Sequence, residues 1–95
     1  PPLLDKTSPL EITIENQSEG EALDLKLNVE FPEEIKIMRG TTNKQIYSLR
    51  SNEDIKWEIN LKPLEAGDHV IKIFIKFMDP DQNKIEEVKE FPFSI

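Results

Sequence analysis

The chain contains no cysteine among its 95 residues and only one histidine, His69. The lack of cysteine excludes a disulfide-stapled scaffold, a thiolate metal site and a cysteine nucleophile. A zinc site would have to rely on carboxylates almost alone, which protein zinc sites seldom do. His69 follows a turn in "EAGDH", and no motif around it supplies a nucleophile or an orienting partner. We therefore predict that the protein is not an enzyme.

Glycine is scarce, and long apolar runs are absent. The only glycines are Gly20, Gly40 and Gly67, which are isolated from one another, and this excludes a glycine-rich phosphate loop. No window approaches the ~20 apolar residues of a membrane-spanning helix, so we expect no direct membrane insertion. No segment carries a sustained apolar stripe with a period of 3.6 residues, so we expect no significant helix.

Acidic residues outnumber basic ones, and the formal net charge is −7 at pH 7. Nucleic acids and anionic membrane surfaces repel such a chain, so neither is an expected partner. The charge also favours solubility and a monomeric isolated domain. The length suffices for one modest core, which predicts a single domain over residues 1–95. Because the chain begins at "PPLLD" without a methionine, we expect it to be a segment of a longer protein.

Alternation of apolar and polar residues is abundant. The clearest segments are "LEITIEN", "ALDLKLNVEF" and "DIKWEINLK". Strict alternation places one face of a strand in a core and the other in water, which is typical of half-buried antiparallel strands. In the third segment Trp57 shares the apolar face with Ile59 and Leu61. We therefore predict that Trp57 is a core residue rather than an exposed platform for sugars.

The segment "HVIKIFIKFM" is apolar on both faces. Val70, Phe74 and Met78 lie opposite the isoleucines and share their face with two lysines. A strand that is apolar on both sides is typically central in its sheet or carries a contact surface. These residues are therefore a candidate partner-binding strip. The alternative is that neighbouring side chains and the lysine stems cover them.

The final segment, "KIEEVKEFPFSI", is predicted to bury Phe91, Phe93 and Ile95 on one face. Val88 is out of phase with them, which predicts a bulge near residues 86–87. Pro92 indicates an edge strand or the end of pairing. Between residues 35 and 49 two interpretations stay open: "IKIM" and "QIYSL" form two short strands, or one strand and a loop.

Turn-forming segments separate these runs and indicate an all-β fold: an immunoglobulin-like antiparallel β-sandwich of about seven strands. The segments "LEITIENQSEGEALDLKLNVEFPEEI" and "DIKWEINLKPLEAGDHVIKIFIKFMDPDQNK" resemble CARDB/NEW3-like domains of bacterial and archaeal proteins. The resemblance implies an immunoglobulin-like sandwich that serves as a spacer, stalk or binding module. It implies no catalytic residues, and it favours an extracellular or cell-surface location.

The stretch "FMDPDQNKIEE" resembles the start of a calcium loop. If such a loop begins at Asp79, then Asp81 and Asn83 occupy its third and fifth positions and Glu90 its twelfth. Lys84 stands where that loop requires glycine, so only a looser site with weak calcium affinity is conceivable. The candidate metal ligands are thus Asp79, Asp81, Asn83 and Glu90. The alternative, which we favour, is an ordinary hairpin turn. No other cofactor is expected.

The first functional hypothesis is a non-catalytic module of a larger prokaryotic protein. It would act as a spacer or as a protein–protein interaction or adhesion domain, with neighbouring domains or another protein as partners. A second hypothesis is a module that binds carbohydrate or calcium and is appended to an enzyme, which an exposed aromatic platform would favour. A third is an intracellular appendage that binds peptides, which an exposed groove beside an unpaired strand edge would favour.

Overall fold

The alternating segments form seven antiparallel strands in the computed structural model, which describes residues 4–95. Their bounds are β1 (Ser8–Glu15), β2 (Ala22–Glu30), β3 (Ile35–Arg39), β4 (Asn43–Leu49), β5 (Asp54–Pro63), β6 (Asp68–Met78) and β7 (Lys84–Ser94). The predicted all-β class with about seven strands is confirmed. Residues 4–95 contain no helix, and hence none with the length and apolar character to cross a membrane.

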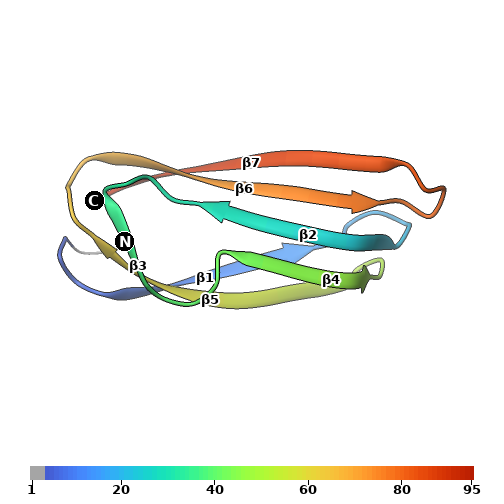
Figure 1. Cartoon of the computed structure of the whole chain (residues 1–95), viewed down its shortest axis with the longest axis horizontal. Helices are drawn as coiled ribbons and strands as arrows, with labels where there is room; N and C mark the ends of the chain where they lie inside the picture. The colour runs from blue at the N-terminus through green and yellow to red at the C-terminus, as the bar shows by residue number, and fades with distance from the viewer. Residues whose placement is uncertain (1–3) are drawn as a thin grey trace.

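The strands make two sheets that face each other (Figure 1). One sheet has three strands in the order β1-β5-β3, and the other has four in the order β4-β2-β6-β7. β1 pairs with β5 along its whole length, from Ser8 opposite Leu61 to Glu15 opposite Asp54. One sheet is therefore one strand wider than the other, which becomes important at the β1 and β7 edges.

The core lies between the sheets and consists of the apolar phase of each strand. Trp57 is only 9% exposed and belongs to this core, as predicted. The buried apolar residues of the three-stranded sheet are Ile12, Ile35, Trp57, Ile59 and Leu61, and those of the four-stranded sheet are Ala22, Leu25, Leu27, Val29, Leu49, Ile71, Ile73 and Ile75. Both sheets thus bury one face, as half-buried antiparallel strands do.

The region between residues 35 and 49 forms two strands, and they belong to different sheets. β3 pairs with β5, whereas β4 returns to pair with β2. Gly40 joins them with a φ of +108°, a conformation that side chains disfavour. A Cβ at this position would lie 2.9 Å from the carbonyl oxygen of Glu58, so the close crossing requires glycine. This connection spans the two sheets on the side away from β1 and β7.

The bulge predicted near residues 86–87 is absent, and that prediction was wrong. β7 pairs with β6 in one continuous register from Lys84 to Ser94. Val88 is out of phase with Phe91 because it faces outward, opposite Phe74. A register shift instead occurs in β2 between Leu23 and Lys26.

The prediction that Phe91 is buried was also wrong, since its side chain is 50% exposed. Phe93 and Ile95 are half-buried. The physical reason is that the three-stranded sheet has no strand to lay over β7. The edge position indicated by Pro92 is correct, because β7 pairs only with β6 within the described range.

The molecule is elongated, with extents of 46 × 18 × 17 Å, and the described chain starts and finishes at the same end of it (Figure 1). Asp5 donates from its backbone N–H to the carbonyl of Pro63 at 2.8 Å. Gly67 and Ile95 exchange backbone hydrogen bonds of 3.1 and 3.3 Å. Asp5 and Ile95 therefore both lie beside the β5–β6 connection.

Candidate functional site

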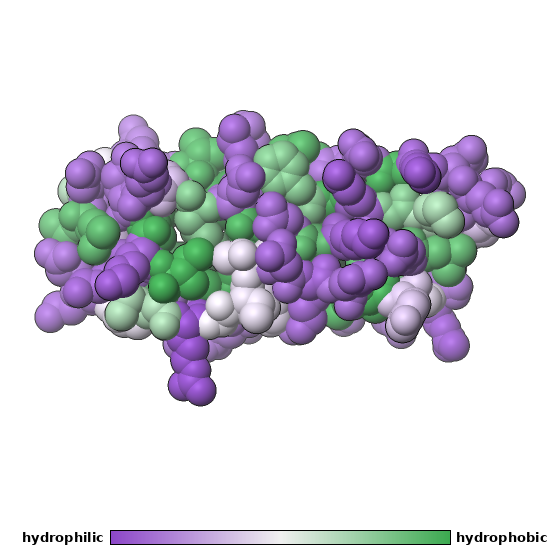
Figure 2. Space-filling model, viewed as in Figure 1, coloured by the Kyte–Doolittle hydropathy of each residue, from purple (hydrophilic) through white to green (hydrophobic). Residues whose placement is uncertain are grey.

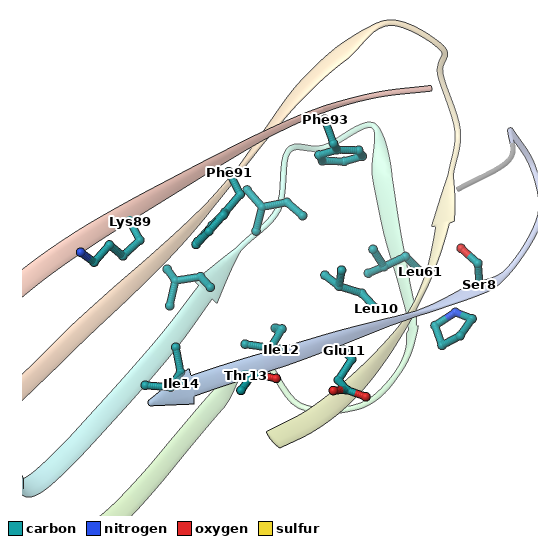
Figure 3. Close-up of a pocket in the computed structure, with 13 residues that line it drawn as sticks. Ser8, Leu10, Glu11, Ile12, Thr13, Ile14, Leu61, Lys89, Phe91 and Phe93 are labelled. Carbon is teal, nitrogen blue, oxygen red and sulfur yellow. The ribbon is translucent and has the colours of Figure 1, made fainter. Parts of the chain in front are cut away.

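An apolar groove opens between the two sheets where the edges of β1 and β7 face each other. It has a volume of about 600 Å³ and is lined from β1, β6 and β7, with Leu61 of β5 at its floor. Figure 3 shows Leu10, Ile12 and Ile14 pointing from β1 into the same space as Phe91 and Phe93 from β7. The lining comes from segments at opposite ends of the sequence, which the fold alone brings together.

The alternation of β1 divides its side chains between the groove and the solvent. Figure 3 shows Glu11 and Thr13 pointing to the side of the strand opposite Leu10, Ile12 and Ile14. Glu11 and Thr13 are exposed, whereas Ile12 is buried. The groove is therefore lined mainly by apolar side chains, with Lys89 of β7 as the charged residue among them, while Glu11 and Thr13 point away from it.

Phe91 and Phe93 are the aromatic wall of the groove. Phe93 packs against the ring of His69, with the ring centroids 5.5 Å apart and the planes inclined by 35°. His69 is buried on the inner face of β6, and its Nε2 lies 3.0 Å from the carbonyl oxygen of Glu65. The only histidine of the chain is thus part of the packing behind this wall.

The groove continues along the full length of β1. A second hollow of about 580 Å³ adjoins the first and shares Thr13, Ile14, Lys89 and Phe91 with it. It extends past the end of β1 to Ser18. The result is one long slot between two strand edges rather than a closed cavity.

The β1 edge has backbone groups free for hydrogen bonding. Asn16 donates from its backbone N–H to the carbonyl of Glu53 at 3.0 Å. The even-numbered residues of β1 therefore direct their backbone N–H and C=O groups toward β5. Odd-numbered residues consequently direct their N–H and C=O groups away from β5. Within the part of the chain that the structure describes, Glu11, Thr13 and Glu15 meet no other strand there.

The β7 edge is less suited to pairing. The hydrogen bonds between Gly67 and Ile95 mean that odd-numbered residues of β7 direct their backbone N–H and C=O groups toward β6. Even-numbered residues direct these backbone groups outward, toward the free edge of the sheet. Pro92 is among the outward residues and has no N–H to donate. Lys89 and Glu87 lie in the inward phase and are 4.0 Å apart. Proline and inward charges are devices that protect an edge strand against pairing.

The predicted partner-binding strip lies on the outer face of the four-stranded sheet. Val70 is 42% exposed, while Phe74 and Met78 are half-buried. Two ion pairs with β7 flank Phe74: Lys72 lies 4.0 Å from Glu90, and Lys76 lies 3.8 Å from Glu86. On the face seen in Figure 2, apolar groups reach the surface in separate patches among hydrophilic side chains. The strip lies opposite the core, as predicted, and its role in binding stays a prediction.

The candidate calcium ligands are not all brought together. Asp79, Asp81 and Asn83 share the turn between β6 and β7, but Glu90 lies seven residues beyond Asn83 on a regular strand. At about 3.3 Å per residue, that separation is roughly 20 Å. Glu90 is instead 4.0 Å from the ammonium of Lys72. In residues 4–95 no group of three or more histidine, cysteine, aspartate or glutamate side chains is placed to hold a metal ion.

The carboxylate of Asp79 organises this turn through hydrogen bonds. Its Oδ1 accepts from the N–H groups of Asp81 and Asn83, both at 2.9 Å, and its Oδ2 accepts from the Asn83 side-chain amide at 3.1 Å. The bonds from Asn83, chiefly, hold the pKa of Asp79 below its ordinary value, because they favour the charged form. These contacts are those of an ordinary turn built on aspartate.

Two exposed aromatic residues were missed by the sequence analysis. Tyr47, on β4, is 91% exposed, and Phe91 is half-exposed at the groove. A signal for Phe91 was present in the sequence, because Glu87 and Lys89 share its phase on β7. Lysine and glutamate are almost never fully buried, so a strand face that carries them beside phenylalanines indicates partial exposure.

No protein-family model matches this chain, and no curated protein matches it either.

Proposed function

We propose that this domain is a non-catalytic protein-interaction module and that its binding surface is the apolar groove between β1 and β7. The observation that supports the proposal most directly is the half-exposed Phe91 in a groove beside free backbone groups of β1. Exposed apolar surface flanked by polar groups is typical of sites that bind other proteins. A groove beside an unpaired strand edge favours the peptide-binding hypothesis over the carbohydrate and calcium hypotheses.

The spacer hypothesis has less support. A domain that holds its neighbours apart adds most length when the chain enters at one end and leaves at the other. Here Asp5 and Ile95 both lie beside the β5–β6 connection, so the 46 Å axis would add little separation. The groove begins at Ser8 and Phe93, close to Asp5 and Ile95, and runs away from them along β1 as far as Ser18.

A peptide-library experiment tests the proposal. A random peptide library is panned on the wild-type domain, on a Phe91→Asp variant and on a matched Phe74→Asp variant. Both variants place one carboxylate on β6 or β7, but only the first places it in the groove. We expect peptides that bind the wild type and Phe74→Asp, and that lose binding to Phe91→Asp.

Two outcomes would contradict the proposal. If the wild type enriches no peptide, the domain is not a peptide-binding module. If binding survives Phe91→Asp but is lost with Phe74→Asp, the binding surface is the outer strip of Val70, Phe74 and Met78. Circular dichroism on both variants checks that each retains its fold, so that a loss of binding is not a loss of structure.

A further inference from the structure

The groove has the dimensions and the chemistry of a place for one more strand. The three-stranded sheet ends at β1, while the facing sheet continues by one strand to β7. A strand added beside β1 would lie about 4.8 Å from it in the plane of the same sheet. It would then cover the inner face of β7, where Phe91 is left half-exposed.

The backbone of β1 is prepared for such a strand. The N–H and C=O groups of Glu11, Thr13 and Glu15 point away from β5 and are spaced at every second residue. This is the arrangement with which a β-strand accepts a neighbour by edge addition. The opposite edge, on β7, presents Pro92 among its outward residues and carries Lys89 and Glu87 on its inner face.

The side chains around the edge define the occupant. Alternate residues of an added strand enter the groove, where they meet Leu10 and Ile14 of β1 and the rings of Phe91 and Phe93. Those residues must be apolar. The remaining residues lie on the outer face of the sheet beside Glu11, which is exposed. Residues opposite a glutamate are most favourable when they are basic.

A second copy of this domain fits the same edge poorly. Antiparallel pairing of two β1 edges centred on Glu11 places the two Glu11 side chains opposite each other, and pairing centred on Thr13 places Glu11 of each copy opposite Glu15 of the other. Pairing of β1 with the outward residues of β7 would set the same glutamates against Glu86 and Glu90. Like charges directly opposite each other destabilise a strand pair, and each copy carries a net charge of −7.

We propose that the groove binds an extended segment of a separate protein, which adds a strand to the free edge of β1. The segment alternates apolar residues, which enter the groove, with lysine or arginine residues, which lie beside Glu11 and Glu15. This inference rests on the proposed function and specifies its partner.

The test uses a synthetic peptide of about nine residues, which is long enough to span β1 at about 3.3 Å per residue. Valine or isoleucine alternates with lysine or threonine. The control peptides carry glutamate in place of lysine, or the same residues with the apolar ones grouped together. The readouts are amide NMR shifts and hydrogen exchange of the domain. We expect saturable binding, with new exchange protection at Glu11, Thr13 and Glu15, and at least about tenfold weaker binding of both controls.

Two matched proline variants decide which edge is used. Thr13→Pro removes the central outward N–H of β1, and Val88→Pro removes an outward N–H of β7. Neither N–H belongs to the ladder with the neighbouring strand, so both variants are expected to fold, as Pro9 and Pro92 do at equivalent positions. Thr13→Pro should weaken binding by about tenfold or more, and Val88→Pro should leave it unchanged.

Several results would overturn the inference. Protection on Glu86, Val88 and Glu90, with binding lost in Val88→Pro, would assign the edge to β7. Equal binding of the acidic peptide would refute the charge preference. Dimerisation of the free domain through β1, detected by sedimentation and abolished by Thr13→Pro, would make a second copy the occupant. If library peptides bind the groove but show no alternation of apolar and polar residues, and do not protect the backbone N–H groups of β1 from exchange, the proposed function stands and this inference fails.

Discussion

Replacement of Trp57 by alanine removes the largest side chain that the three-stranded sheet contributes to the core. Trp57 is 9% exposed, and truncation of a buried aromatic residue costs about 3–5 kcal/mol. The ammonium of Lys44 lies 6.0 Å from the ring centroid, and loss of this contact adds about 0.5–1 kcal/mol. The indole N–H, however, is buried without a hydrogen-bond partner in the described chain, which costs about 1–3 kcal/mol in the wild type.

Because removal of the unpaired N–H offsets part of the loss, we expect a net destabilisation of about 3 kcal/mol. That is a large fraction of the roughly 5–15 kcal/mol that stabilises a domain of this kind. Urea unfolding followed by circular dichroism measures it. With an m-value of about 1.5 kcal/mol per molar urea, the midpoint should fall by about 2 M.

The variant Trp57→Phe is the matched control, since it keeps a ring in the core and removes the unpaired N–H. It should cost less than about half of what alanine costs. A loss below about 1 kcal/mol for Trp57→Ala would refute the assignment of this side chain to the core. A loss for phenylalanine equal to that for alanine would refute the argument about the N–H.

Four further predictions concern stability and ion binding. Phe74→Ser should cost about 1 kcal/mol in urea unfolding, because Phe74 is only half-buried on the outer face; a loss equal to that of Trp57→Ala would make it a core residue. Gly40→Ala should lower the melting temperature more than Gly67→Ala. Both glycines have a positive φ, but only at Gly40 would the added Cβ meet a backbone atom, the carbonyl oxygen of Glu58 at 2.9 Å. Equal effects would show that the positive φ alone, and not this close contact, sets the cost. The pKa of Asp79 is lowered in the fold, so its contribution to stability is present above the ordinary aspartate pKa of about 3.9 and is lost as pH falls through the lowered value. The stability difference between wild type and Asp79→Asn should therefore shrink below about pH 4, and calcium at several millimolar should produce no saturable NMR shift at residues 79–83; a saturable shift would restore the calcium hypothesis.

The alternation pattern was sufficient for the class of fold and for much of the core. Trp57, Ile59 and Leu61 are buried on one face of β5 as their spacing indicates. The outward placement of Phe74 followed from the same reasoning, because its phase on β6 is opposite to that of the buried isoleucines. These features depend only on the two-residue period of an extended chain.

The errors all concern β7 and have one origin. The two-residue period shows which side chains of a strand point toward the facing sheet, but it does not show whether that sheet has a strand to cover them. Phe91 lies in the inward phase and is still half-exposed, because the facing sheet stops at β1. The predicted bulge rested on the assumption that Val88 had to join that phase, whereas it pairs opposite Phe74 on the outer face.

The sequence by itself determined that this protein is built from antiparallel strands, which of their faces are apolar and where the chain turns. These properties are local, because side-chain direction alternates along any strand and turns depend on a few adjacent residues. Only the tertiary structure decided that one sheet is a strand narrower than the other and that β1 and β7 border the same groove. Strand order depends on pairing between residues as far apart in the sequence as Ser8 and Leu61, and no local pattern encodes which edges meet.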